Sequence, residues 1–188
     1  METSTRHKLI ETAAMLFRKK GYHGVGIAEI LNVTGVPKGS LYHHFPNGKQ
    51  DLAIASAEWA TTGMIRIIDD AFETASSFED GATTLCHKLA KFFDLSGNWD
   101  GCPVSNTLLD GPENQVFRET VARAFEMWVE TTSAHGIRLG RPPPHARDAS
   151  ELLLIAIQGA WSMARARQSS EELRKLSQRL YGGHTANP

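Results

Sequence analysis

A short run of residues near the N-terminus carries side chains that suit contact with a nucleic acid. These are Lys38, Ser40, Tyr42, His43 and His44. A cation holds phosphates, while hydroxyl, phenol and imidazole groups can also read base edges in the DNA major groove. Leu41 and Phe45 lie in the same run at helical spacing, so a helix would bury both and turn the polar set outward. The run therefore predicts a helix that lies in a DNA groove.

The residues before this helix predict a helix-turn-helix. Residues 27–33 form the first helix of the pair, with Ile27, Ile30 and Leu31 on its inner face. Gly35 suits the left-handed backbone that ends a helix, and Pro37 favours the first turn of the next one. Two helices joined by a glycine turn are the helix-turn-helix arrangement. An ordinary helical hairpin is the alternative, and the many groove-reading side chains argue against it.

The helices on either side of this pair also have clear signals. A first helix is expected to begin at Ser4 or Thr5 and to end at Gly21. Asn47 is expected to cap the fourth helix, with Gln50 completing a capping box. Lys49 would then lie in the first turn, where exposed N–H groups favour an anion, so we expect it to bind a phosphate rather than to be an ordinary solvated lysine.

Almost every periodic stretch in the remaining chain repeats at helical spacing, which predicts an all-α fold of nine helices. We expect a three-helix DNA-binding domain over residues 1–46 and a ligand-binding and dimerisation domain over residues 47–188. The eighth helix, from Asp148 to about Arg167, is apolar nearly all round and must be covered on every side. A ninth helix carries Leu173, Leu176, Leu180 and Tyr181. These two helices from each of two subunits would make a four-helix interface, and a monomer is the alternative.

Composition supports this division. The chain is 41% hydrophobic and 22% charged, as in ordinary soluble proteins. Residues 1–52 hold seven Lys or Arg and four Asp or Glu, a net charge of +3, so the remainder carries −4 of the total of −1. A basic head on an acidic body is expected if only the head meets phosphate.

Several classes of protein are disfavoured. The segment METSTRHK lacks the apolar core of a signal peptide, and the longest apolar run is too short for a bilayer, so we expect a cytoplasmic protein with no membrane partner. Cys86 and Cys102 fit a reducing compartment and match no zinc pattern. A helical enzyme is a remote alternative, because no nucleophile elbow, metal-binding His pair or phosphate-cradling loop is present. We expect no catalytic residue, metal or cofactor.

From Gly21 to Asp51 the sequence resembles the TetR family of transcriptional regulators. The matching residues are Gly21-Tyr22, Ile27-Ala28, Gly35-Val36, the run from Lys38 to Phe45, and Lys49. The segment PKGSLYHHFPNGK and Gly101-Cys102-Pro103-Val104 resemble the LmrA/YxaF-like branch. The resemblance implies a homodimeric repressor that binds a two-fold symmetric DNA operator and releases it when a small molecule enters the C-terminal domain.

Site residues carried over from the resemblance fall on the recognition helix and just after it. Base or phosphate contacts are implied for Lys38, Gly39, Ser40, Tyr42 and His43, and DNA-backbone contacts for His44 and Lys49. Two positions depart from the pattern of the family. Gly26 stands where a hydroxyl residue often caps the second helix, and Pro37 replaces a capping serine.

The effector site is predicted from aromatic and soft residues in the body. They are Phe92, Trp99, Cys102, Asn106, Phe125, Trp128 and Trp161. Trp99, Cys102 and Asn106 lie in a loop and a short helix, where pocket mouths form, whereas aromatics at helical spacing are more often core. Such a pocket would suit an apolar or aromatic effector. Two other functions are alternatives. The C-terminal domain could sense oxidation through Cys102, or the protein could activate transcription rather than repress it.

Overall fold

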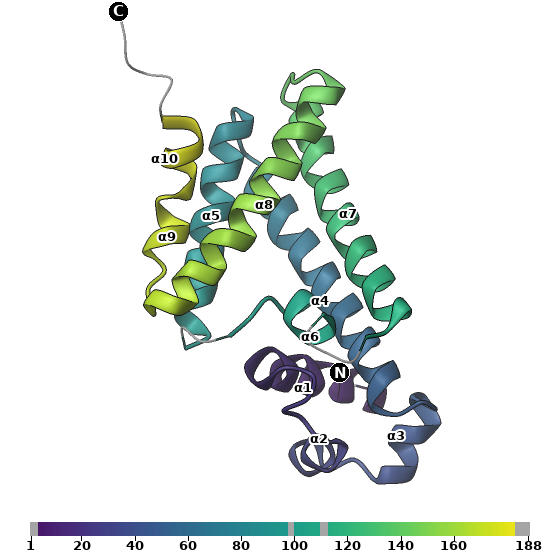
Figure 1. Ribbon diagram of the computed structural model, residues 1–188. Coiled ribbons are helices and arrows are strands. Elements are labelled where there is room, and N and C mark those ends of the chain that lie inside the picture. Colours follow the sequence, from purple (N-terminus) through teal and green to yellow (C-terminus); the bar gives the residue numbers. More distant parts are fainter. Residues whose placement is uncertain (1–3, 98–99, 110–112, 183–188) are drawn as a thin grey trace, which may run out of the picture. The chain divides into compact units, whose positions relative to one another are not determined.

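The computed structural model describes residues 4–97, 100–109 and 113–182, in which all regular structure is helical (Figure 1). The helices are α1 (Thr5–Lys20), α2 (Ile27–Thr34), α3 (Lys38–His44), α4 (Lys49–Phe72), α5 (Phe78–Leu95), α6 (Ser105–Leu108), α7 (Gln115–Arg138), α8 (Pro143–Arg167), α9 (Glu171–Arg174) and α10 (Leu176–Tyr181). The predicted all-α fold is confirmed.

The chain divides into two compact units. The first comprises residues 1–62 and 101–124, and the second comprises residues 63–100 and 125–188. Helices α4 and α7 each contribute residues to both units. The functional boundary expected between residues 46 and 47 stays a prediction.

In the first unit, α1 packs against α2, α3 and α6. The Ser4 side chain caps α1 by accepting a hydrogen bond from the His7 N–H, and Gly21, with φ of 68°, ends the helix. The inner face of α1 is apolar, since Leu9, Ala13, Leu16 and Phe17 are all buried. The first half of α4 is tied to α1 by the Ser56 hydroxyl, which donates to the carbonyl oxygen of Ile10 at 3.3 Å.

The helix-turn-helix forms as the local sequence predicts. Gly35 ends α2 in the left-handed conformation, with φ of 66°. Gly26 and Pro37 precede α2 and α3 without a side-chain cap, because neither residue has a side-chain hydrogen-bond acceptor. Leu41 and Phe45 are 0% and 2% exposed, so α3 is anchored through the two apolar positions that the sequence marks.

In the second unit, α5 packs against α9 and α10, which also contact α8 (Figure 1). Ser77 caps α5 by accepting a hydrogen bond from the Asp80 N–H at 3.1 Å, as expected from the sequence. The aromatic centre of this unit includes Phe72, Phe78 and Phe93, all 2% exposed or less.

Three boundaries differ from expectation. Helix α8 begins at Pro143, five residues before Asp148, because proline is well suited to the first turn, where its missing N–H has no helical acceptor. Helix α6 begins at Ser105 rather than at Pro103. Helix α7 begins at Gln115, where the Asn114 side chain accepts from the Val116 N–H at 2.9 Å; the start expected at residues 111–113 lies largely outside the described residues.

The predicted ninth helix is two short helices, α9 and α10, that meet at Lys175. Leu173 and Leu176 are 0% and 7% exposed within the chain itself. The four-helix interface with a second subunit stays a prediction, since Leu180 and Tyr181 of the same stripe are only half-buried. Sequence periodicity shows that a leucine is buried, but it does not show which surface buries it.

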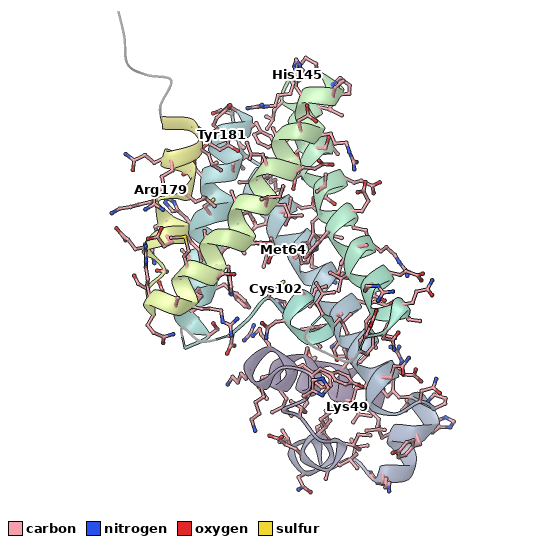
Figure 2. The ribbon with its side chains drawn as sticks, in the orientation of Figure 1. Lys49, Met64, Cys102, His145, Arg179 and Tyr181 are labelled. Carbon is pink, nitrogen blue, oxygen red and sulfur yellow. The ribbon has the colours of Figure 1, made fainter. Side chains whose placement is uncertain are left out.

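The C-terminal helices are held by a buried carboxylate. Glu172 is 5% exposed and pairs with Arg167 of α8 and Arg179 of α10, the latter labelled in Figure 2. Hydrogen bonding from Arg179, together with the charge of Arg167, lowers the pKa of Glu172. A carboxylate whose pKa is lower in the folded state stabilises the fold above its unfolded pKa, and that stabilisation is lost as the pH falls through the folded pKa.

Glu172→Gln is therefore expected to lower the free energy of unfolding at pH 7 and to have a shrinking effect as the pH is taken from 5 to 3. Urea unfolding of both proteins across that range measures the difference. Glu171→Gln is the matched control, because Glu171 makes only an exposed pair with Lys175 and should change stability little. A Glu172→Gln effect that is equal at pH 7 and pH 3 would contradict the assignment.

Candidate nucleic-acid interface

The outer face of α3 presents the side chains that the sequence marked for DNA contact. Lys38, Gly39, Tyr42 and His43 are exposed, and Ser40 and His44 are half-buried. Tyr42 is 41% exposed, which is a high value for an aromatic side chain. Because Leu41 and Phe45 fix the opposite face, α3 holds these polar groups on a rigid backbone.

Contacts between neighbouring side chains order this face. The Lys38 ammonium lies 5.9 Å from the centre of the Tyr42 ring. The rings of His43 and His44 meet edge to face with their centres 5.1 Å apart. Such contacts limit the rotamers of long side chains before DNA arrives, which lowers the entropic cost of binding.

Gly48 lies next to the ring of Tyr42. Its φ is +60°, and a Cβ built on it would lie 3.1 Å from Cε1 of Tyr42 and 3.2 Å from Cδ1 of Ile27. Both the left-handed backbone and the closeness of the ring require glycine here. Sequence reasoning missed this role, because a glycine near a helix start carries no sign of what packs on it.

Gly48→Ala is therefore expected to lower the free energy of unfolding by about 1–2 kcal/mol, the usual cost of a left-handed residue with a Cβ. It should also weaken DNA binding, because the Tyr42 ring must shift. Thermal unfolding and DNA titration measure the two effects. Gly140→Ala is the matched control: its φ is +93° and no atom lies within 4 Å of a built Cβ, so it should lose stability while Tyr42 keeps its place.

Lys49 opens α4 and is labelled in Figure 2. Its ammonium lies 4.2 Å from the centre of the Tyr22 ring, and burial lowers its pKa. The expected capping box of Asn47 and Gln50 is wrong. Instead the Asp51 carboxylate accepts from the Asn47 backbone N–H at 2.9 Å and from the Asn47 side-chain amide at 3.1 Å.

The effector candidates in the second unit fall into two pairs. Phe92 and Trp161 have ring centres 6.2 Å apart, and Phe125 and Trp128 have ring centres 5.4 Å apart. Trp161 is 7% exposed, meets Phe93 edge to face at 5.3 Å, and donates from Nε1 to the carbonyl oxygen of Asp100 at 2.9 Å. Phe93 therefore belongs to the same aromatic cluster as Phe92 and Trp161.

The remaining effector candidates are divided between the first unit and the undescribed part of the chain. Cys102 and Asn106 lie in the first unit, where the Asn106 N–H donates to the Cys102 carbonyl oxygen at 3.0 Å. Asn106 also packs so closely on Gly101 that any Cβ there would overlap its amide. Trp99 lies outside the described residues.

The other cysteine, Cys86, is fully buried, and burial raises the pKa of its thiol to about 11. It therefore carries almost no thiolate at neutral pH, and a buried thiol of this kind is unreactive. Among the described residues, no helix is long and apolar enough to cross a membrane, and no group of three His, Cys, Asp or Glu is placed to hold a metal ion.

Comparison with known protein families covers most of the chain. Residues 9–55 match the model of bacterial regulatory proteins of the tetR family. Residues 79–179 match the model of the C-terminal domain of LmrA/YxaF-like transcriptional regulators. The first match contains the helix-turn-helix and Lys49, and the second contains α5 to α9 and part of α10.

Individual relatives agree with the family models. The chain is 27% identical to the HTH-type transcriptional regulator LmrA of Bacillus subtilis over 174 residues, covering 92% of this chain and 93% of that protein. The crystal structure of regulatory protein TetR from Rhodobacter sphaeroides superposes with a TM-score of 0.81 at 27% identity, covering 96% and 99% of the two chains. The regulator CifR, solved with a 26-base-pair operator duplex, shares the fold with a TM-score of 0.78 at 18% identity, covering 97% and 98%. The chain therefore belongs to the TetR family of DNA-binding transcriptional regulators and has an LmrA/YxaF-like C-terminal domain.

Proposed function

We propose that this TetR-family regulator is a repressor that binds a two-fold symmetric operator as a homodimer and releases it when a small molecule binds the C-terminal domain. As a member of this family it is a DNA-binding regulator and not an enzyme. The observation that carries the proposal is the division of α3 into a buried side, Leu41 and Phe45, and an exposed side rich in groove-reading groups.

Each group on the exposed side of α3 has a proposed partner on the DNA. Ser40, Tyr42 and His43 would reach base edges, where each good contact discriminates by about 1–3 kcal/mol. Lys38, His44 and Lys49 would hold phosphates, which fixes the register of the helix on the duplex. Gly39 carries no side chain, so the α3 backbone could approach the groove closely at that position.

The exposed side of α8 supports a homodimer. Leu152, Ile155 and Met163 are 53%, 68% and 43% exposed and follow one another at helical spacing. A contiguous apolar stripe of this kind on a soluble protein marks an interaction surface. A second copy would bury the stripe against its own equivalent, which is the usual symmetric arrangement. The dimer would then place its two α3 helices about 34–36 Å apart, as two half-sites require.

The aromatic pairs of the second unit support an apolar or aromatic effector. Phe92 with Trp161 and Phe125 with Trp128 supply large flat surfaces within this unit. The C-terminal domain would have two conformations, which hold the α3 helices of the dimer at different spacings. An effector that binds the conformation with the wrong spacing for DNA would weaken DNA binding. The size of this effect is set by the difference in its affinity for the two conformations. Helix α4, which carries Lys49 and reaches into the second unit, would transmit the change.

Selection of bound duplexes from a random pool tests the DNA half of the proposal. We expect an inverted repeat whose half-sites lie one helical turn apart, with binding that weakens steeply as salt rises. Sedimentation of the same protein alone and with the selected duplex gives the subunit number. No preferred duplex, or a single subunit on the duplex, would overturn the proposal.

A thermal-shift screen of planar, weakly polar compounds tests the effector half. A true effector should raise the melting temperature, lower operator affinity, and lose potency with Trp161→Leu or Trp128→Leu. A compound whose effect survives both changes would remove these aromatics from the site. If peroxide releases the operator from the wild type and not from Cys102→Ser, the protein senses oxidation rather than a ligand.

A further inference from the structure

Tyr22 lies immediately after α1 and is held on two sides by buried aromatic rings. Its ring stacks on Phe17 with centres 5.9 Å apart and planes inclined by 17°. It meets the edge of Phe117, the third residue of α7, with centres 5.4 Å apart. Phe17 and Phe117 are 0% and 1% exposed, so they fix the orientation of the Tyr22 ring.

The Lys49 ammonium lies over the ring that these two residues hold, 4.2 Å from its centre. A cation over an aromatic face is attracted by the negative potential of the π-system, and more so when water is partly excluded. Burial lowers the pKa of Lys49 and raises that of Tyr22, in agreement with a contact that is partly shielded from solvent. An ammonium has three donors, so contact with a ring leaves hydrogens for another acceptor.

We propose that Tyr22 is the positioning residue for Lys49: its ring holds the lysine side chain where it meets a DNA phosphate, and Phe117 of α7 holds the ring. The inference rests on the proposed function, in which Lys49 binds the DNA backbone. A free lysine loses much rotamer freedom when it binds a phosphate. A lysine already held on a ring loses less, so the ring adds to DNA affinity without touching DNA.

The same contact connects α7 with the DNA-binding helices. Helix α7 extends from Gln115 in the first unit to Arg138 in the second, and Phe117 lies in its first turn. A shift or rotation of this end of α7 would move the Tyr22 ring. The Lys49 side chain that lies over this ring would move with it. Effector binding could therefore reach a phosphate contact through α7 as well as through α4.

The test is a double-mutant cycle measured as affinity for the selected operator duplex over a range of salt. Tyr22→Leu removes the aromatic face, Phe117→Leu loosens the ring, and Lys49→Met removes the cation. Tyr22→Leu should weaken binding about two- to fivefold for each subunit of the dimer, as expected for a cation–π contact near the surface, and Phe117→Leu should weaken it in the same direction. Tyr22→Phe keeps the ring and should restore the affinity. In the Lys49→Met background, Tyr22→Leu and Phe117→Leu should have no further effect.

Salt dependence separates positioning from loss of charge. Lys49→Met removes one phosphate contact from each subunit of the dimer and should reduce the slope of log affinity against log salt by about 1.8, whereas Tyr22→Leu keeps the charge and should leave the slope close to that of the wild type. Lys91→Gln, which removes an exposed charge from α5, is the control for net charge and should change neither slope nor affinity. Circular dichroism and thermal unfolding establish that each variant is folded at the temperature of the titration.

Equal effects of Tyr22→Leu in the two backgrounds would show that the ring serves only the fold, and would overturn the inference. If Tyr22→Leu does not fold, a series of increasingly fluorinated phenylalanines at position 22 keeps the ring shape while weakening its negative face. Affinity should then fall with each fluorine, and a flat series would overturn the inference. A wild-type protein that prefers no duplex would refute the proposed function instead, so the two failures are distinguishable.

Discussion

Replacing Tyr42 and His43 together by alanine is expected to abolish discrimination between the operator and random DNA. Both side chains are exposed on α3, and neither contributes to the buried side formed by Leu41 and Phe45. Two lost base-edge contacts in each subunit, at about 1–3 kcal/mol each, correspond to a loss of specific affinity of at least about 30-fold for each half-site. Non-specific binding should persist, because Lys38 and Lys49 still meet phosphates.

Competition titration of the operator duplex against a scrambled duplex measures this prediction. His145→Ala is the matched control, because His145 is an exposed histidine near the start of α8 in the other unit (Figure 2). The control should bind as the wild type does, and thermal unfolding should show that the double variant is folded at the temperature of the titration. Retained discrimination by the folded double variant would show that α3 does not read the operator.

Gly81→Ala is expected to destabilise the second unit strongly. A Cβ at this position would overlap the ring of Phe72, which is 0% exposed. That ring cannot easily move aside, since it stacks on His135 with centres 5.3 Å apart and lies 5.6 Å from Phe78. Overpacking of this kind costs about 1–3 kcal/mol and sometimes more, which corresponds to a fall in melting temperature of about 2–12 °C for a chain of this size.

Chemical unfolding of Gly81→Ala, Phe72→Leu and the double variant measures the clash directly. The smaller leucine should accommodate the new methyl group, so the double variant should be more stable than the sum of the single effects allows. Gly63→Ala on α4 is the control: no atom lies within 4 Å of a built Cβ, and alanine favours a helix by up to about 1 kcal/mol. Strict additivity of Gly81→Ala and Phe72→Leu would contradict a direct contact.

The features that are predicted well from the sequence are those that depend on residues close together in the chain. Ser4, Gly21 and Gly35 set helix ends through their own caps and backbone angles, and those ends are confirmed. The division of α3 into buried and exposed sides also follows from local spacing, because helical periodicity needs no knowledge of the rest of the chain.

What the sequence misses depends on residues far apart in the chain. The pairing of Phe92 with Trp161 joins α5 to α8, and the contact of Lys49 with Tyr22 joins α4 to the end of α1. The break between α9 and α10 accompanies the pairing of Glu172 with arginines on both sides, where the leucine pattern alone favours one continuous helix. The assignment of DNA-binding and effector residues remains a prediction for the same reason: their partners are other molecules.

The path of the chain between the two units determines which fragments of the protein can fold alone. Two of the three passages, at residues 62–63 and 124–125, lie inside the continuous helices α4 and α7. A fragment cut near residue 46 would lose Phe117, one of the two buried rings that hold the Tyr22 ring. We therefore expect the whole chain to melt in one cooperative step, and limited proteolysis to yield no stable N-terminal fragment.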